Sequence, residues 1–241
     1  KYNAFCQSDQ EKALDAAKCS EHRWRNREPI GRIDGVPVTV KDLVIARDYP
    51  TLRGSETSDK RLISEEDAPA VARLREHGGI IIGKTTTPEY GWKGVTDSPL
   101  TGVTLNPWNI NCTPGGSSGG AAVAALCGMG PLHIGTDGGG SVRIPAAFCG
   151  IVGIKANFGR IPVYPASPFG TLSHLGPMTR DVEDAALMLT VMAEPDPRDA
   201  FSLPFDGRDY SAALGAGVCG LRIAYSPDLG YANVDPQVSF L

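Results

Sequence analysis

Two glycine-rich loops that contain serine are the segments of this chain best suited to do chemistry. Residues 113–120 hold Ser117, and residues 135–141 end on Ser141 directly after three glycines. A serine that attacks a carbonyl needs room for its substrate, and nearby backbone amides must bind the oxyanion that develops. Consecutive glycine amides could form such a nest. Together the loops favour a hydrolytic site over the simpler interpretation, which is two tight turns.

A phosphate-binding loop is one competing interpretation. Residues 78–85 read GGIIIGKT and match the pattern G-x-x-x-x-G-K-[ST]. In a phosphate loop, however, the strand precedes the first glycine, whereas here three isoleucines occupy the middle of the motif and favour a strand themselves. Lys84 should also open a helix, but three threonines and Pro88 follow it. Binding of ATP or GTP is therefore disfavoured.

A nucleophile elbow is the second competing interpretation. Residues 115–119 read GGSSG and match G-x-S-x-G, and Asp137 and His174 follow in the order that an α/β-hydrolase requires. An elbow joins a strand directly to a helix, but residues 106–114 contain two prolines and three asparagines and do not resemble a strand. His174 is more simply read as an ordinary loop histidine.

Three stretches of the sequence closely resemble the amidase signature family, and the resemblance extends over nearly the whole chain. They are residues 35–42 (GVPVTVKD), 114–120 (PGGSSGG) and 135–145 (GTDGGGSVRIP), with residues 176–180 (GPMTR) as a further landmark. The resemblance implies an α/β fold with a mixed β-sheet core covered by helices on both faces. Family members are longer, so residues 1–241 are expected to be the N-terminal portion of one amidase signature domain whose C-terminal remainder is missing.

The resemblance also assigns roles to particular residues. Ser141 matches the nucleophile, Ser117 matches a bridging serine joined to Gly116 by a cis peptide bond, and Lys41 matches the base. The implied oxyanion hole consists of backbone amides from Gly138, Gly139, Gly140 and Ser141. The implied supporting residues are Ser118, Asp137 and Arg143. Neither a metal nor any other cofactor is expected.

The chemistry expected of Lys41 depends on its surroundings. A lysine side chain has an ordinary pKa near 10.4 and is protonated at neutral pH, so it cannot act as a base unless burial lowers that pKa. Asp42 would hold Lys41 charged if both side chains lay on the same face, but neighbours on a strand point to opposite faces. We therefore expect Lys41 to draw a proton from Ser117, which draws one from Ser141.

The elements that must position these residues follow from hydrophobic spacing and turn signals. Short strands that alternate with helices predict an α/β layer fold. Predicted helices cover residues 9–24, a segment capped by Asp67, residues 118–127, a segment capped by Thr179, and a beginning at residues 234–236. Predicted strands cover residues 38–40, 80–82, 132–134 and 221–225, with a further short apolar stretch at 151–154 and a long proline-rich connection at 162–178.

Composition narrows the remaining functional classes. The 241 residues are 41% hydrophobic and 21% charged, with a net charge of −4 and no block of basic residues, which argues against nucleic acid or an anionic membrane as a partner. The six cysteines show neither a CxxC pair nor zinc-ligand spacing and indicate reduced thiols in a cytoplasmic protein.

The preferred function is a stand-alone bacterial-type amidase that acts on a small amide substrate through an acyl-enzyme and releases ammonia or an amine. The alternative is the glutaminase-type A subunit of a tRNA-dependent amidotransferase, which would share the same motifs. A binding protein on an inactive hydrolase scaffold is disfavoured because all three catalytic positions are present. Homodimer formation stays open.

Overall fold

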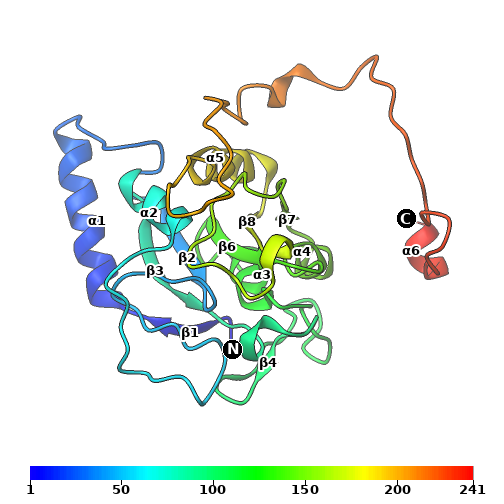
Figure 1. The fold of residues 1–241 in the computed structure, drawn as a ribbon, viewed down its shortest axis with the longest axis horizontal. Helices are drawn as coiled ribbons and strands as arrows, with labels where there is room; N and C mark the ends of the chain where they lie inside the picture. The colour runs from blue at the N-terminus through cyan, green and yellow to red at the C-terminus, as the bar shows by residue number, and fades with distance from the viewer. Residues whose placement is uncertain (241) are drawn as a thin grey trace. The chain divides into compact units, whose positions relative to one another are not determined.

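The computed structural model describes residues 1–240, and within them the main sheet has six strands (Figure 1). Their spatial order is β1 (Phe5–Ser8), β3 (Ile80–Thr85), β2 (Pro37–Lys41), β6 (Leu132–Asp137), β8 (His174–Thr179) and β7 (Val152–Gly153). The central strand β2 pairs in parallel with both β3 and β6, while β1, β8 and β7 join in antiparallel fashion. The sheet is therefore mixed, as expected.

Helices cover both faces of this sheet. They are α1 (Gln10–Arg25), α2 (Pro69–Glu76), α3 (Gly119–Leu126), α4 (Arg143–Cys149) and α5 (Val182–Met192). One buried cluster joins α2 and α5 to Val40 of β2 and Ile134 of β6, and a separate cluster joins α3 and α4 to Met178 of β8. A small hairpin of β4 (Asp97–Ser98) and β5 (Gly102–Val103) lies in the loop before α3.

Small residues let α3 lie close to the sheet. Its sequence is GGAAVAAL, and every residue except Leu126 is buried. A Cβ atom on Gly120 would collide with the backbone of Thr86 and Ala4, so only glycine permits this approach. The close packing brings the N-terminus of α3, and with it Ser118, against the carboxyl ends of the central strands.

Two helix starts differ from the prediction. The N-cap of α2 is Ala68, because the Asp67 carboxylate accepts a hydrogen bond from the Arg47 amide instead of capping the helix. The N-cap of α5 is Asp181, whose side chain accepts from the Asp184 amide. Thr179 is instead the last residue of β8. Both predicted caps were wrong by one or two residues, as local sequence competes with tertiary partners at helix ends.

Several strands and helices also depart from the sequence-based expectations. The predicted connection at residues 162–178 contains most of β8, which tolerates Pro177 because that residue contributes its carbonyl, accepting from the Ile154 amide. The sequence did not predict β1 or α4. Residues 221–225 form no strand, so that prediction was wrong.

The chain divides into two compact units, Lys1–Ser211 and a second that begins at Ala212. The first unit contains the sheet and helices α1 to α5, together with short 3₁₀ turns at Glu89–Gly91 and Gly170–Leu172. Within the second unit, the described residues form a 3₁₀ turn at Leu214–Ala216 and helix α6 (Pro236–Phe240). Across residues 1–240, no helix combines the length and apolarity needed to cross a membrane.

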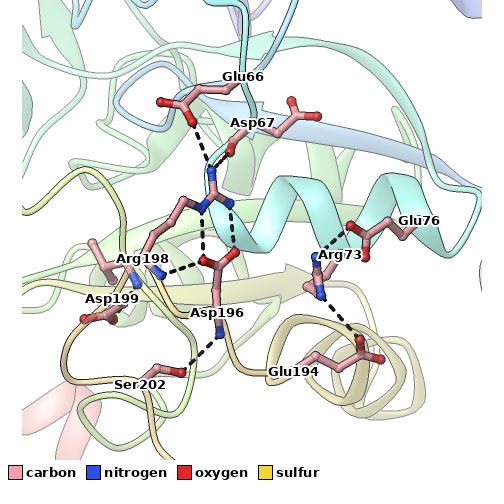
Figure 2. A network of polar contacts seen from close by, with 10 residues as sticks. Glu66, Asp67, Arg73, Glu76, Glu194, Asp196, Arg198, Asp199 and Ser202 are labelled. Atoms are coloured by element: carbon pink, nitrogen blue, oxygen red, sulfur yellow. Dashed lines mark hydrogen bonds and ion pairs between the residues drawn. The ribbon is translucent and has the colours of Figure 1, made fainter.

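A network of ion pairs fastens the segment that follows α5 to the start of α2 (Figure 2). The Arg198 guanidinium donates to both carboxylate oxygens of Asp196, at 2.9 and 2.8 Å, and also to Glu66 and to the Asp67 carbonyl. The neighbouring Asp199 carboxylate accepts from the Val163 amide at 2.8 Å. Since Val163 begins one wall of the cleft described below, this network also anchors that wall.

Candidate active site

Lys41 is the last residue of β2, and its side chain is completely buried. Its amine lies 2.6 Å from the hydroxyl oxygen of Ser117, 2.9 Å from that of Ser118 and 2.8 Å from that of Thr136. The first two partners come from the loop before α3, and the third comes from β6. The parallel pairing of β2 with β6 therefore brings together the three segments that the sequence motifs singled out.

The environment of Lys41 favours the uncharged amine. Burial lowers the pKa of Lys41 well below its ordinary value, while the more distant Asp137 carboxylate acts in the opposite direction. The three hydrogen-bond partners within residues 1–240 are hydroxyl groups, which accept from the N–H groups of the amine, and those of Ser117 and Thr136 can also donate to its lone pair. Asp42 bonds instead to the Leu52 amide, so the alternation expected along the strand keeps its carboxylate away from Lys41.

Ser118 joins the two glycine-rich loops. Its hydroxyl donates to the Thr136 carbonyl and accepts from the Thr136 amide, both at 3.2 Å, and its own amide donates to the Ser141 carbonyl at 3.2 Å. The peptide bond between Gly116 and Ser117 is cis, as the family resemblance implied. The first loop is thus held in register with the second by backbone contacts as well as by Lys41.

Asp137 organises the glycine loop that leads to Ser141. Its carboxylate accepts from the Gly140 amide at 2.7 Å and the Val142 amide at 3.1 Å, and Arg143 donates through Nε and Nη2 at 3.0 and 2.9 Å. Burial alone would raise the pKa of Asp137, but the hydrogen bonds from Arg143 and from the two amides lower it to about 2. Asp137 is therefore ionised and fixes the turn between β6 and α4.

The amides expected to bind an oxyanion are not equally available. Among residues 1–240, the N–H groups of Gly138, Gly139 and Ser141 have no hydrogen-bond partner. The Gly140 amide, by contrast, is already engaged by Asp137, which removes it from the expected set of donors in this conformation. A Cβ atom on Gly139 would meet nothing within 4 Å, so the loop is open where a substrate would approach.

These groups line one cleft of about 1570 Å³. Ser117, Thr136 and Ser141 lie on it together, so the two serines face a shared space; the Ser141 hydroxyl makes no hydrogen bond to residues 1–240. Apolar and aromatic side chains form much of the remaining wall. They include Leu43, Trp92, Ile144, Phe169 and Leu172, and the rings of Trp92 and Phe169 stack with centroids 5.6 Å apart.

The structure does not bring together the residues of the two competing motifs. Residues 80–85 are strand β3, and the Lys84 side chain is buried with its amine 2.8 Å from the Val44 carbonyl, so no phosphate loop forms there. The His174 imidazole donates from Nδ1 to the Leu172 carbonyl, and no strand leads directly into residues 115–119. Neither nucleotide binding nor an elbow triad has a basis in this geometry.

Thr136 is the contact that the sequence interpretation missed. Its hydroxyl is as close to the Lys41 amine as that of Ser118, and it also lies on the cleft. Its position directly before Asp137 in the second glycine-rich loop was the available signal, since that motif had already been assigned a role in the site.

Comparison with known proteins gives concordant results. The family model described as Amidase matches residues 1–241. An acylamidase from Rhodococcus erythropolis is 45% identical over 98% of this chain and 50% of its own length, and the glutamyl-tRNA(Gln) amidotransferase A subunit of Solidesulfovibrio magneticus is 40% identical over 99% and 49%. The chain thus spans about half the length of these curated relatives.

Solved structures show the same likeness. A bacterial aryl acylamidase of the amidase signature enzymes superposes with a TM-score of 0.83 and 34% identity, over 90% of this chain and 45% of that one. A peptide amidase in complex with the inhibitor chymostatin gives a TM-score of 0.79 and 32% identity, over 88% and 45%.

Proposed function

The chain belongs to the amidase signature family, and we propose that it hydrolyses the C–N bond of carboxylic amides with Ser141 as nucleophile, Ser117 as proton bridge and Lys41 as base. The observation that carries this proposal is the set of contacts around Lys41. The amine is fully buried, and its partners within residues 1–240 are hydroxyls alone, one of them 2.6 Å away on Ser117, which shares the cleft with Ser141. Such an amine is suited to accept a proton.

The reaction would proceed in two halves. The Ser117 hydroxyl gives its proton to Lys41 and takes the Ser141 proton, while the Ser141 oxygen attacks the amide carbonyl. The amides of Gly139 and Ser141, with Gly138 beside them, stabilise the oxyanion. The relay then returns the proton to the leaving nitrogen, the C–N bond breaks, and ammonia or an amine departs from an acyl-enzyme ester. Water attacks that ester along the same relay and releases the carboxylic acid.

The side chains that line the cleft indicate which kind of substrate it would bind. Stacked Trp92 and Phe169, together with Leu172 and Ile144, present an apolar surface beside the serines. Binding of an alkyl or aryl group against apolar walls is favourable, because it removes apolar surface from water. We therefore propose that linear amides with an aryl or alkyl acyl group are the preferred substrates.

Glutamine is the second candidate substrate. The 40% identity to an amidotransferase A subunit favours it, because that relative matches nearly the whole chain. Such a subunit would release ammonia from glutamine and pass it to a partner that acts on misacylated tRNA. Glutaminase activity that depends on an added partner protein would support this candidate over a stand-alone amidase.

The experiment is an activity and labelling assay on the full-length protein. A panel of aliphatic, aromatic and urea-like amides identifies the substrate, and a fluorophosphonate probe reports the reactive serine. We expect Ser141→Ala to abolish both turnover and labelling, and Lys41→Ala to fail nearly as badly at neutral pH. Ser64→Ala, outside the cleft with its hydroxyl bonded to the Glu66 carbonyl, is the control that should behave as wild type. Full activity in either active-site variant would overturn the proposal.

A further inference from the structure

A second buried lysine lies on the neighbouring strand. Lys84 of β3 is aligned with Val40 of β2, and its side chain is 0% exposed. Its amine lies 2.8 Å from the Val44 carbonyl oxygen, 3.2 Å from the Thr51 hydroxyl and 3.5 Å from Oδ1 of Asp42. Asp42 is the residue that directly follows Lys41, and it is 1% exposed.

The two lysines have partners of opposite character. The Lys84 amine donates to a carbonyl and to a hydroxyl, and it lies within ion-pair distance of a carboxylate. The carbonyl and the carboxylate can only accept. Within residues 1–240, the Lys41 amine has hydroxyl partners alone, and those of Ser117 and Thr136 can donate to it. Burial lowers the pKa of Lys84 as well, but the Asp42 carboxylate works against that fall. The contacts are thus suited to an ammonium at Lys84 and to a free amine at Lys41.

The negative charge of the buried Asp42 carboxylate is compensated by Lys84. Oδ1 of Asp42 accepts from the Leu52 amide at 3.1 Å and from Gln7 at 3.4 Å, while Oδ2 has no hydrogen-bond partner within residues 1–240. Burial raises the pKa of Asp42, and the charge of Lys84 works against that rise. A buried carboxylate without a cation would either take up a proton or favour the protonated form of a neighbouring amine, and Lys41 is the residue directly before Asp42.

The other groups near the two lysines do not replace this pair. On the Lys41 side, Asp137 is already paired with Arg143. His133 is neutral, because burial lowers its pKa to about 4 even though the hydrogen bond from Nε2 to the Gly130 carbonyl acts in the opposite direction. On the Lys84 side, burial raises the pKa of the Cys6 thiol, and Arg53 is directed to the Thr51 carbonyl.

We propose that Lys84 is a positioning residue that neutralises Asp42 and thereby leaves Lys41 as the uncharged amine of the relay. This role rests on the proposed function of Lys41 as the base. Lys84 touches no reacting atom. Its ammonium also binds the Val44 carbonyl and so holds the chain that leaves β2, directly after the base, in place.

The test is the pH dependence of kcat/KM, measured on the full-length protein with the best amide of the panel. The acidic limb reports the loss of a proton from the base of the free enzyme. In Asp42→Asn, the uncompensated Lys84 charge disfavours protonation of Lys41, so the limb should move about one pH unit lower. In Lys84→Met, the uncompensated Asp42 charge favours protonation, so the limb should move about one unit higher.

The double variant and a control complete the design. Asp42→Asn combined with Lys84→Met removes both charges, and its limb should return to within about 0.3 of the wild-type pH. Lys155→Met is the control, since the hydrogen bond that the Lys155 amine makes within residues 1–240 goes to the Ala156 carbonyl; its limb should not move. Melting temperatures establish whether each variant is folded. If one of the two single variants does not fold, the shift of the acidic limb in the other still tests the proposal.

The outcomes separate this proposal from the one on which it rests. Limbs that stay at the wild-type pH in the folded single variants, even with a reduced plateau, would show that the pair is only structural. If Lys41→Ala or Ser141→Ala remains active, the relay itself fails, and the acidic limb has another origin.

Discussion

The Lys41 amine and the Ser117 hydroxyl lie 2.6 Å apart at the buried end of the central strand β2. Because Ser117 is the only one of the three hydroxyl partners proposed to pass a proton onward, Ser117→Ala should lower kcat/KM by about 10²–10⁴-fold, the range of general-base catalysis. Steady-state kinetics on the folded variant provide the measurement. A loss smaller than about tenfold would mean that Lys41 reaches Ser141 by another route.

Thr136 supports the same amine without carrying the proton. Thr136→Val removes one hydrogen bond at nearly constant volume, and a net hydrogen bond contributes about 0.5–1.5 kcal/mol, so kcat should fall by roughly 2- to 12-fold. Thr179→Val is the matched control, because Thr179 is buried too but its hydroxyl donates to the Asp181 carbonyl, outside the cleft. Equal losses in the two variants would argue against a specific role for Thr136.

Asp137 links the stability of the loop to pH. Its pKa falls from an ordinary value of 3.8 to about 2 in the folded state, which corresponds to about 2 kcal/mol of stability. Since the folded pKa is the lower one, this contribution is complete above about pH 4 and is lost as the pH falls towards 2. Asp137→Asn should therefore lower the melting temperature clearly at about pH 7 and by roughly half as much at about pH 3. A difference in melting temperature between Asp137→Asn and the wild type that is the same at both pH values would contradict this linkage.

Arg198 is the centre of the network in Figure 2. Arg198→Met leaves the Asp196 carboxylate, which is 5% exposed, without its cation, and should destabilise the protein by about 1–3 kcal/mol. Arg61→Met is the matched control, because Arg61 is 90% exposed and, among the described residues, pairs only with Asp59, so a change within about 0.5 kcal/mol is expected. Thermal melts of both variants measure the difference. Similar shifts in melting temperature for Arg198→Met and Arg61→Met would show that the network does not stabilise the protein.

Local patterns predicted the elements that are dominated by local forces. The isoleucine run at residues 80–82 became the first half of β3, Ser118 stands at the start of α3, and Lys41 ends β2. The direction of Lys41 followed from strand alternation alone, which places it and Asp42 on opposite faces. The family resemblance supplied the expectation that Lys41 and the two serine-bearing loops meet in one site, which no local pattern contains.

The errors arose where distant partners decide local structure. Pro177 argued for a loop, but β8 pairs on one side with residues 133–137 of β6 and meets β7 over only two residues. Asp67 resembles a helix cap, yet its carboxylate accepts a hydrogen bond from the Arg47 amide and forms an ion pair with the Arg75 guanidinium. The engagement of the Gly140 amide and the contact of Thr136 depend on loop geometry at the level of single hydrogen bonds, which composition cannot show.

The three hydroxyls around Lys41 come from positions 76, 77 and 95 residues away in the chain. Such contacts close long loops, whose entropic cost is met only when the parallel pairing of β2 with β6 is in place. During refolding, helices of local origin should therefore precede the complete amine pocket. Recovery of catalysis would then be a late event that reports assembly of the sheet's centre rather than collapse of the chain.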